Sequence, residues 1–291
     1  MNNGQESRYQ LLNELGQGGF GAVYRALDRQ TSGHVAIKFL QRLDPDSRAR
    51  FQREVRILQE LAQLSFVPAL LDWNLETEQP WLAIEYCEGG SLCSWVGAGK
   101  PWTHAALAVL GAAKALAEVH GRNGHHRDVK PANLLVGLAR DGETWVVKLA
   151  DFGLAGIPTP SKPWVTQDAF GTEAYKAPEI RRPGAVFNPK ADVWSLGLTT
   201  LEVLTGGRNL ARLDVLRMPK SLRRLVRAML AADPAHRPNA RRVAQVAHAI
   251  LSKHAPAALT DKTILAPKSK INWGAIAGLA FLGIALASGS K

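Results

Sequence analysis

The first residues along the chain whose types and spacing could serve a chemical function are the glycines of residues 16–23, which read GQGGFGAV. Strand-like sequence lies on both sides, so the glycines would sit in a hairpin whose backbone can approach a phosphate chain closely. A dinucleotide-binding turn would lead straight into a helix, whereas the residues after Gly21 are typical of a strand. Glycine turns between strands are common, so this run alone is weak evidence for nucleotide binding.

A lysine among apolar residues follows in the next strand-like run, which reads Val35-Ala36-Ile37-Lys38. Its ammonium group could pair with the α- and β-phosphates of a nucleotide. The alternative is a lysine at a strand edge in water. Glu54 argues against that alternative, because it borders the apolar stripe of a predicted helix and can face the interior, where Lys38 needs a partner.

Three further motifs follow in the order His126-Arg127-Asp128-Val129-Lys130-Pro131-Ala132-Asn133, Asp151-Phe152-Gly153 and Ala177-Pro178-Glu179. Together with the glycine run and Lys38 they resemble the signature set of protein kinases. The match extends from about residue 9 to about residue 253, and all the motifs stand in the family's order at plausible spacing. The chain therefore resembles the eukaryotic-like, or Hanks-type, serine/threonine kinases of bacteria.

The resemblance implies a phosphoryl-transfer site that uses ATP and two Mg²⁺ ions. It implies that Asp128 orients the acceptor hydroxyl and takes its proton, with Lys130 near the transferred phosphate. Asn133 and Asp151 would hold the metal ions. Phosphoryl transfer depends mostly on positioning and charge neutralisation, so the metal ions and a lysine would supply most of the catalysis.

The same resemblance implies that ATP contacts the smaller lobe and the hinge. Lys38, held in position by Glu54, would anchor the phosphates, and the backbone of the hinge would bind the adenine edge. The expected nucleotide-binding residues are Gly16, Gly18, Gly21, Val23, Ala36, Lys38, Glu54, Glu85 and Cys87.

Two features of the resemblance indicate serine or threonine as the acceptor. Lys130 is similar to a lysine that tyrosine kinases usually lack, and Gly171-Thr172-Glu173-Ala174-Tyr175 looks like the serine/threonine version of the substrate-facing loop. Related small-molecule kinases lack that whole segment, so we expect protein substrates. A catalytically inactive pseudokinase scaffold is the alternative, and the presence of every catalytic residue disfavours it.

The pattern of elements predicts an α+β fold with two lobes. Up to about residue 86, short strand-like runs alternate with turns and are interrupted by one helix after Asp44 and Pro45. Helical periodicity dominates later, with Thr103 expected to cap the first helix and Asp141-Gly142 expected to turn a hairpin. We expect a kinase domain over residues 9–253, with a β-rich N-lobe at about 9–86 and an α-rich C-lobe at about 90–253.

The resemblance also implies one ion pair and one regulatory site. Glu179 and Arg237 should form a buried pair that joins the substrate-facing loop to a late helix. Arg127 directly precedes Asp128, and in kinases of this type it pairs with a loop phosphate. We therefore expect activation by phosphorylation within residues 159–172, with Thr166 the best candidate and Thr172 a substrate-loop hydroxyl.

The 291 residues, 46% of them hydrophobic, are enough to build a buried core, so the chain is not of the disordered class. Its net charge of +11 is compatible with nucleic acid, anionic lipid or acidic protein partners and does not choose among them. The densest basic stretch is residues 208–227. Its simplest interpretation is a solvated helix face, and we expect no nucleic-acid partner.

The cysteines and the C-terminal segment indicate the cellular compartment of the protein. Cys87 and Cys93 lack a disulfide or metal spacing and no apolar leader precedes them, which predicts a reducing cytosol for the kinase domain. Residues 271–288 carry no charge and have about the minimum length of a membrane span. Glycine and alanine are common in membrane helices, and Trp273 stands where an interfacial aromatic residue belongs.

The expected arrangement is a single-pass membrane protein with a cytoplasmic kinase domain and a juxtamembrane linker over residues 254–270. More lysines precede the span than follow it, which places the domain on the cytoplasmic side. Gly274 and Gly278 form a small-xxx-small pair that hints at a homodimer. The competing interpretations are a segment too short and glycine-rich to insert, and a receptor kinase whose outer domain is absent.

Overall fold

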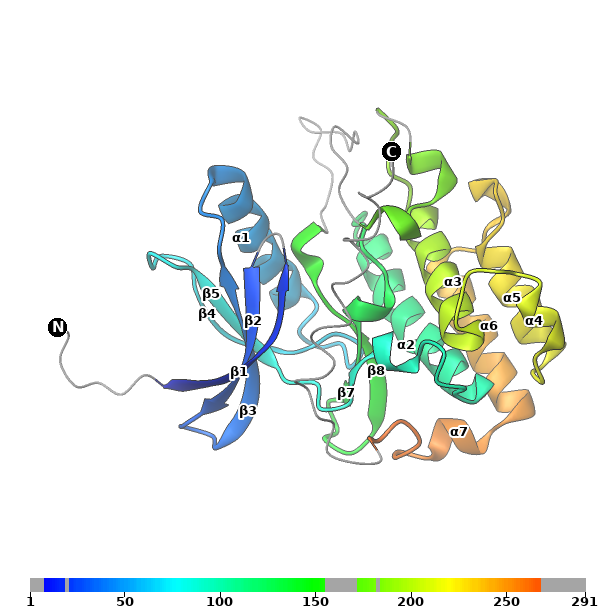
Figure 1. Cartoon of the computed structure of the whole chain (residues 1–291), viewed down its shortest axis with the longest axis horizontal. Helices are drawn as coiled ribbons and strands as arrows, with labels where there is room; N and C mark the ends of the chain where they lie inside the picture. Colours follow the sequence, from blue (N-terminus) through cyan, green and yellow to red (C-terminus); the bar gives the residue numbers. More distant parts are fainter. Residues whose placement is uncertain (1–7, 19–20, 155–171, 182–183, 268–291) are drawn as a thin grey trace, which may run out of the picture. The chain divides into compact units, whose positions relative to one another are not determined.

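A computed structural model describes residues 8–18, 21–154, 172–181 and 184–267 (Figure 1). Within these residues the chain forms two compact units, which agree with the predicted α+β, two-lobed class. The smaller unit comprises residues 8–62 and 68–86, and the larger unit comprises residues 63–67 and 87–267. Each unit is described below by itself.

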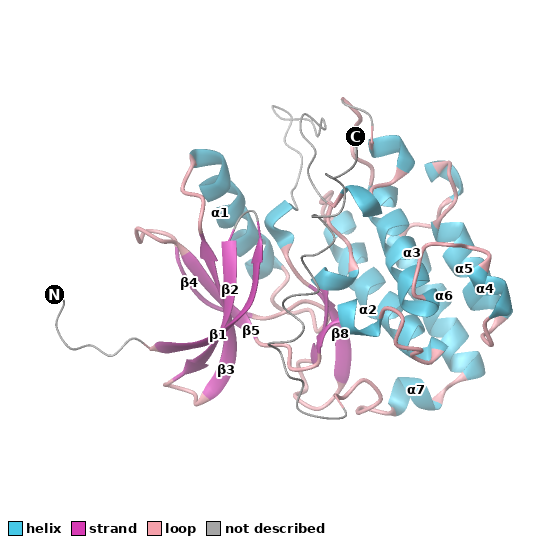
Figure 2. Ribbon diagram, viewed as in Figure 1, coloured by secondary structure: helices cyan, strands magenta, loops and turns pink. Residues whose placement is uncertain are grey.

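The smaller unit is a five-stranded antiparallel sheet with one helix, α1, against it (Figure 2). Two apolar clusters hold it together: Ala26, Val35, Ile37 and Ala83 within the sheet, and Leu40, Phe51, Val55 and Leu82 between sheet and helix. The strand order is β1-β2-β3-β5-β4. The elements are β1 (Tyr9–Gly18), β2 (Gly21–Asp28), β3 (Gly33–Leu40), α1 (Pro45–Glu60), β4 (Leu70–Asn74) and β5 (Trp81–Glu85).

Local sequence explains where α1 begins. The Asp44 carboxylate accepts a hydrogen bond from the Ser47 backbone amide at 3.0 Å, and Pro45 occupies the first turn, where an amide proton is not needed. The predicted helix start is therefore confirmed. Phe51, Val55 and Leu58 then recur at helical spacing on the buried face, with Glu54 beside them.

The larger unit is mainly helical and carries a three-stranded sheet, ordered β6-β7-β8. The helices are α2 (Trp102–Gly121), α3 (Pro189–Thr205), α4 (Arg212–Val215), α5 (Lys220–Met229), α6 (Ala240–His254) and α7 (Ala257–Thr260). The strands are β6 (Gly90–Ser91), β7 (Leu134–Leu138) and β8 (Trp145–Leu149). Short 3₁₀ turns are formed by Leu92–Trp95, Pro131–Asn133, Phe152–Leu154, Glu173–Tyr175, Pro178–Ile180 and Pro234–His236.

The central helices explain how the larger unit is assembled. α2 is apolar on most of its circumference and packs against α3, α6 and β8. It passes so close to β8 that a Cβ on Gly111 would lie 2.4 Å from the carbonyl oxygen of Val147, so only glycine fits there. α3 ends at Gly206, whose φ of 71° is the left-handed conformation that glycine adopts without strain.

Two expectations about the larger unit have different outcomes. The hairpin of β7 and β8 is confirmed, with Asp141 accepting hydrogen bonds from the backbone amides of Glu143 and Thr144 at 2.9 and 2.8 Å. The expected cap at Thr103 is wrong, because α2 already begins at Trp102 and no side chain caps it. Pro101 directly before the helix supplies the start signal instead.

The part of the chain beyond α6 was predicted to be a linker, and residues 254–267 pack against the larger unit. The Trp145 backbone amide at the start of β8 donates to the Lys262 carbonyl at 2.8 Å, and Ala258 and Leu265 are buried. The predicted span of residues 271–288 lies outside the described residues. Among the residues that are described, no helix is both long and apolar enough to cross a bilayer.

Candidate active site

In the smaller unit, β3 presents Lys38 to the helix α1. Lys38 pairs with Val23 of β2 on one side and with Leu82 of β5 on the other. Its ammonium group donates to both carboxylate oxygens of Glu54, at 2.9 and 2.8 Å. Glu54 is only 3% exposed, so the expected pair is present and is a charge-assisted contact with little competition from water.

The glycine run forms the hairpin that joins β1 and β2. The sequence predicted a hairpin here, and in the structure Gly16 pairs with Val23 and Gly18 with Gly21. A Cβ on Gly21 would lie 2.3 Å from the carbonyl oxygen of Phe39, so the close approach of β2 to β3 requires a glycine. Residues 19–20 at the tip of the hairpin lie outside the described part of the chain.

The remaining expected nucleotide contacts divide between the two units. Ala36 is buried in β3 opposite Ile84 of β5. Glu85 ends β5, and its carboxylate accepts a hydrogen bond from the Ala69 amide at 3.1 Å, so this side chain orders the strand end. Cys87 is buried and begins the larger unit, where its carbonyl accepts from the Gly90 amide at 3.0 Å.

In the larger unit, the carboxylate of Asp128 receives hydrogen bonds on both oxygens. Oδ1 accepts from the backbone amide and the hydroxyl of Thr172, both at 3.0 Å. Oδ2 accepts from Asn133 Nδ2 at 3.1 Å and lies 2.9 Å from the ammonium of Lys130. Asp128 is 8% exposed, so these partners fix its orientation.

The hydroxyl of Thr172 lies between Asp128 and Lys130. It donates to the carboxylate and accepts from Lys130 Nζ at 2.8 Å. An alcohol in this position has a base for its proton and a cation near its oxygen, which is what a nucleophilic hydroxyl needs. The substrate-facing loop that the sequence placed at Thr172 therefore meets the predicted catalytic residues directly.

A buried carboxylate on α3 holds the catalytic loop in place. Asp192 is 1% exposed and accepts from the backbone amides of His126 at 2.9 Å and Arg127 at 2.7 Å, and from His120 Nε2 at 2.9 Å. Burial alone would raise the pKa of Asp192, but these hydrogen bonds bring it below its ordinary value. They also hold Arg127 at a φ of 71°, a conformation that a non-glycine residue rarely adopts.

His126 links the catalytic loop to the end of β8. Burial lowers its pKa, so the ring is neutral and carries one proton. Nε2 lies 3.1 Å from the Ala150 carbonyl and must donate to it, which leaves Nδ1 to accept from the Asp128 amide at 3.3 Å. The tautomer is therefore determined by its two backbone partners.

Asn133 and Asp151 lie at the same end of the β7–β8 hairpin. Leu134 pairs with Leu149, and the amide of Ala150 donates to the Asn133 carbonyl at 2.9 Å. Asn133 Nδ2 donates to the carbonyl and the carboxylate of Asp128, so the side-chain amide oxygen of Asn133 points away from Asp128. An amide oxygen and a carboxylate are the donor types that Mg²⁺ prefers, so these residues fit the expected metal ions.

Sequence reasoning missed the polar group that supports the substrate-facing loop. Tyr175 donates to Glu202 of α3 at 2.5 Å, while Arg208 donates to Glu202 at 2.6 Å and to the Ala174 carbonyl at 2.8 Å. Burial and the hydrogen bond to Glu202 raise the pKa of Tyr175. These residues come from separate segments, so no local pattern could have predicted their contact.

The expected pair between Glu179 and Arg237 is confirmed. Arg237 Nη1 and Nη2 donate to the two carboxylate oxygens at 2.6 and 2.8 Å. The guanidinium also donates to the carbonyls of Ala231, Ala232 and Lys190 at 2.7, 3.0 and 3.2 Å, and its side chain is fully buried. One arginine thus ties the substrate-facing loop to two separate backbone segments, at residues 231–232 and at Lys190.

The family model described as the protein kinase domain matches residues 9–249 of this sequence. The chain belongs to this family. The bounds are close to the domain predicted from the motifs, and the kinase domain so defined contains every residue of the sites described above.

Several curated relatives are serine/threonine-protein kinases of eukaryotes. KIC1 of Saccharomyces cerevisiae is 34% identical over 214 residues, which cover 72% of this chain and 19% of that protein. TAO2 of Homo sapiens is 36% identical over 208 residues, which cover 68% of this chain and 16% of that protein. The protein ppk11 of Schizosaccharomyces pombe is 34% identical over 206 residues, which cover 69% of this chain and 63% of that protein. The chain thus spans only about a fifth of the first of these, and the bacterial subclass stays a prediction.

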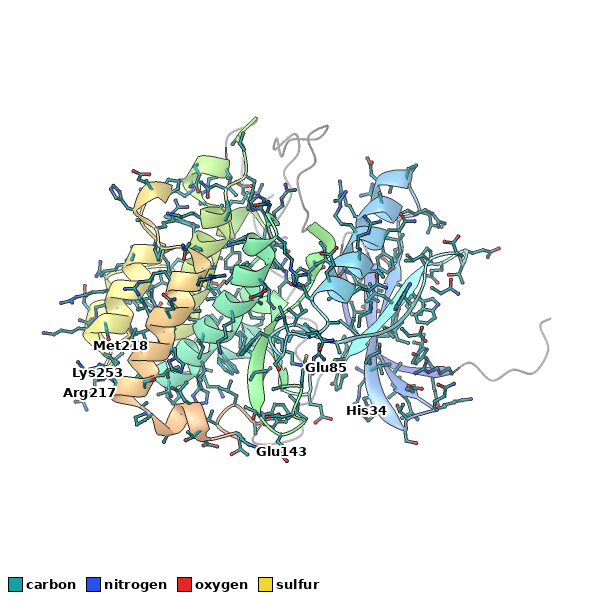
Figure 3. All side chains as sticks on the ribbon, turned by 180° about the vertical axis from the view of Figure 1, so that it is seen from behind. His34, Glu85, Glu143, Arg217, Met218 and Lys253 are labelled. Carbon is teal, nitrogen blue, oxygen red and sulfur yellow. The ribbon has the colours of Figure 1, made fainter. Side chains whose placement is uncertain are left out.

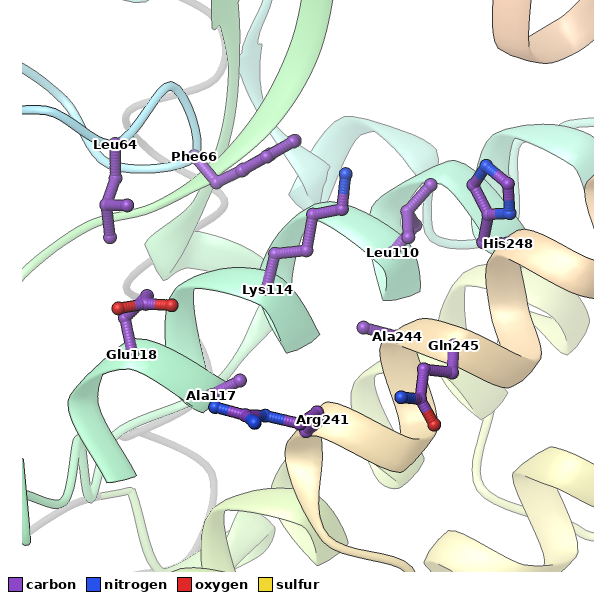
Figure 4. Close-up of a pocket in the computed structure, with 10 residues that line it drawn as sticks. All are labelled: Leu64, Phe66, Leu110, Lys114, Ala117, Glu118, Arg241, Ala244, Gln245 and His248. Atoms are coloured by element: carbon purple, nitrogen blue, oxygen red, sulfur yellow. The ribbon is translucent and has the colours of Figure 1, made fainter. Parts of the chain in front are cut away.

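A separate groove of about 550 Å³ lies in the larger unit between α2 and α6 (Figure 4). Its lining combines apolar side chains, among them Leu64, Phe66 and Leu110, with the charged side chains of Lys114, Glu118 and Arg241. None of the residues expected to bind ATP, metal or substrate lines it. This groove is therefore separate from the catalytic group around Asp128.

Proposed function

We propose that this chain is a serine/threonine protein kinase that transfers the γ-phosphoryl group of Mg-ATP to Ser or Thr hydroxyls of proteins. The position of the Thr172 hydroxyl, which donates to Asp128 and accepts from Lys130, supports this most directly. A substrate hydroxyl held in the same way has its proton beside a base and its oxygen beside a cation. The match to the protein kinase family and the names of the relatives agree with this chemistry.

In the proposed mechanism, the acceptor hydroxyl gives its proton to Asp128 as its oxygen attacks. Asn133 keeps the carboxylate oriented, and Lys130 stabilises negative charge near the attacking oxygen. Bound ATP would supply the γ-phosphoryl group, whose bond to the bridging oxygen breaks as ADP leaves, and Mg²⁺ would neutralise the charge on the phosphate oxygens. Asn133 and Asp151 would hold the metal ions, and Lys38, fixed by Glu54, would hold the phosphates.

Asp128→Asn tests the assignment of the base. We expect turnover to fall by orders of magnitude while ATP binding and the melting temperature stay nearly unchanged, because the nucleotide contacts lie elsewhere. The measurements are transfer of ³²P from ATP and ATP affinity by calorimetry. Near-normal phosphate transfer by the purified variant would contradict the mechanism, and absence of transfer by the parent would favour the pseudokinase scaffold.

Lys38→Met tests the phosphate anchor. We expect loss of activity together with weaker ATP binding, since the variant lacks the cation that Glu54 holds in place. Lys253→Met removes an exposed lysine at the end of α6 and is the matched control, which should keep full activity. Equal activities of the two variants would mean that Lys38 has no part in binding ATP.

We further propose that phosphorylation within residues 159–172 activates the kinase, with Thr166 the best candidate. All of this segment except Thr172 lies outside the described residues. Arg127, next to Asp128, supports the proposal because a phosphothreonine offers it a doubly charged partner. Mass spectrometry of the active enzyme should find the phosphate, and Thr166→Ala should lower activity; an unmodified loop in active enzyme contradicts the proposal.

We also propose that residues 271–288 anchor the protein in a membrane as a single span, with the kinase domain in the cytoplasm and homodimer formation through Gly274 and Gly278. The uncharged sequence and the lysines before it support this. Cell fractionation should place the full chain with membranes and a version ending at Lys270 in the soluble fraction. Equal recovery of both in the soluble fraction would rule out the anchor, and cross-linking of Gly278→Leu against the parent tests the dimer.

A further inference from the structure

The helix α5 has one wholly basic face and one wholly apolar face. Lys220, Arg223, Arg224 and Arg227 recur every three or four residues and therefore share one side of the helix; we call these four residues the α5 basic face. The opposite side, formed by Leu222, Leu225, Val226 and Met229, is buried. Burial of the apolar side fixes the basic face toward the solvent.

This arrangement of charge is unfavourable for the helix itself. Like charges three or four residues apart repel each other, and the α5 basic face contains four such pairs. Lys220 and Arg223 also lie in the first turn, where the helix dipole favours acidic residues and none is present, and Arg224 follows directly. The sequence thus keeps cations where an isolated helix would be more stable with carboxylates.

The nearby acid compensates for only part of this charge. Asp214 is the single acidic residue in the stretch 208–227, which has seven basic residues. Its carboxylate is engaged by Arg227 at 2.9 Å and lies 3.9 Å from Arg223. Lys220 and Arg224 are exposed and make no ion pair within the described residues.

The basic stretch begins against the substrate-facing loop. Arg208 donates to the Ala174 carbonyl at 2.8 Å, and its guanidinium lies over the Tyr175 ring at 4.4 Å. Arg212, at the start of α4, donates to the Thr205 carbonyl at the end of α3 at 3.1 Å. Arg217, between α4 and α5, is exposed at the outer surface of the larger unit (Figure 3). Cations therefore continue from the loop that holds Thr172 to the first turn of α5.

Carboxylates of a protein fit this surface better than a bilayer or a nucleic acid does. A helix that inserts into a membrane uses its apolar face, and that face of α5 is buried in the unit. Residues 208–227 include no aromatic side chain for base stacking or for a membrane interface. The ten residues of α5 span only about 15 Å, which matches a short peptide segment, and guanidinium groups match carboxylates in geometry.

We propose that the α5 basic face, together with Arg217, docks an acidic segment of the protein substrate. The inference rests on the proposed function, because it concerns the substrate class of the same kinase. Docking on the unit that carries the substrate-facing loop would raise the local concentration of the acceptor hydroxyl without any new contact at Asp128.

The test compares two double variants with the same change of charge near the start of a helix. Lys220→Glu with Arg224→Glu reverses the charges of the first and fifth residues of α5, whereas Arg241→Glu with Arg242→Glu reverses those of the second and third residues of α6. Both place glutamates where the helix dipole favours them, so both should fold and melt at or above the parent temperature. The full chain is used in a non-ionic detergent.

The probe is a fluorescein-labelled deca-glutamate peptide, with deca-glutamine as the uncharged control. Anisotropy should show binding of deca-glutamate to the parent that weakens with salt, and an affinity about tenfold lower for the α5 variant, as expected when several exposed ion pairs are lost. The α6 variant should stay within about twofold of the parent. With dephosphorylated casein as an acidic acceptor, the α5 variant should raise KM while kcat and autophosphorylation stay unchanged.

Equal affinity of both variants for deca-glutamate would overturn the docking site. It would also be overturned if the α5 change reduced binding to phosphatidylserine vesicles or to a short DNA duplex and left peptide binding intact. Failure of the proposed function has a different result. In that case neither casein nor the chain itself is phosphorylated by the parent, while the difference in peptide binding between the variants persists.

Discussion

Replacement of Arg237 by alanine should destabilise the larger unit more than any loss of an exposed arginine. The side chain is fully buried and donates five hydrogen bonds, two to Glu179 and three to backbone carbonyls. Alanine leaves all of these acceptors without their donor. Breaking a buried pair in this way costs about 3–5 kcal/mol.

Two features of the site refine this magnitude. Glu179 keeps 23% of its side chain exposed, so water can solvate part of the stranded charge and lower the cost. The three carbonyls oppose this, because each of them also loses a hydrogen bond to a charged donor. We therefore expect a loss of about 4 kcal/mol, which corresponds to ~8–16 °C in melting temperature for a unit of this size.

Differential scanning calorimetry of three variants tests the reasoning. Arg227→Ala removes an exposed arginine whose partner is Asp214 and should cost less than about 1 kcal/mol. Glu179→Gln should fall between the two, because the three carbonyl contacts of Arg237 remain. A melting temperature of Arg237→Ala equal to that of Arg227→Ala or of the parent would refute the account.

Three further changes have outcomes that follow from single contacts. Thr172→Val should lower kcat and Thr172→Ser should largely retain it, because only serine keeps the hydroxyl that Asp128 and Lys130 bind; equal rates in a transfer assay would contradict this. The hydrogen bonds from Arg8 lower the pKa of Asp28 to about 2 from 3.8, so its stabilising effect should be complete above pH 4 and lost as pH falls toward 2. Melts of the parent and Asp28→Asn should therefore converge at low pH, and a constant difference would show that the carboxylate charge is not involved. Gly111→Ala should destabilise by about 1–3 kcal/mol through overlap with the Val147 carbonyl, whereas Gly121→Ala, with open space around it, should be neutral in urea unfolding.

Much of the candidate site could be predicted because its parts are local in the sequence. Lys38 and Glu54 belong to one strand and to the helix that follows it, and the helix periodicity already directed Glu54 inward. Asp128, Lys130 and Asn133 lie within six residues, so one tight loop brings them together whatever the rest of the chain does. The two-lobed division followed similarly from the change of period after residue 86.

The expectation that failed concerns the end of a helix. The contacts that were not predicted join residues that are far apart in the sequence. The start of α2 was misplaced because Pro101 and Thr103 are both start signals and lie two residues apart. The group of Tyr175, Glu202 and Arg208 was not predicted, since nothing in the sequence around Glu202, on the mostly buried helix α3, indicates its partners. Residues 208–227 were interpreted as one solvated helix face, but the structure divides them between α4, α5 and the segments beside them, and such a face is found in α5.

The sequence by itself determined the chemistry: which side chains can bind phosphate, metal and hydroxyl, and which short segments carry them. The tertiary structure decided which distant groups meet them. Thr172 comes to Asp128 across 44 residues, and Asp192 comes to the amides of His126 and Arg127 across 66 and 65. A hydrogen bond acts only within about 3 Å, so such contacts exist only once helices have packed. That packing is set by apolar burial spread over the whole unit, which no single motif encodes.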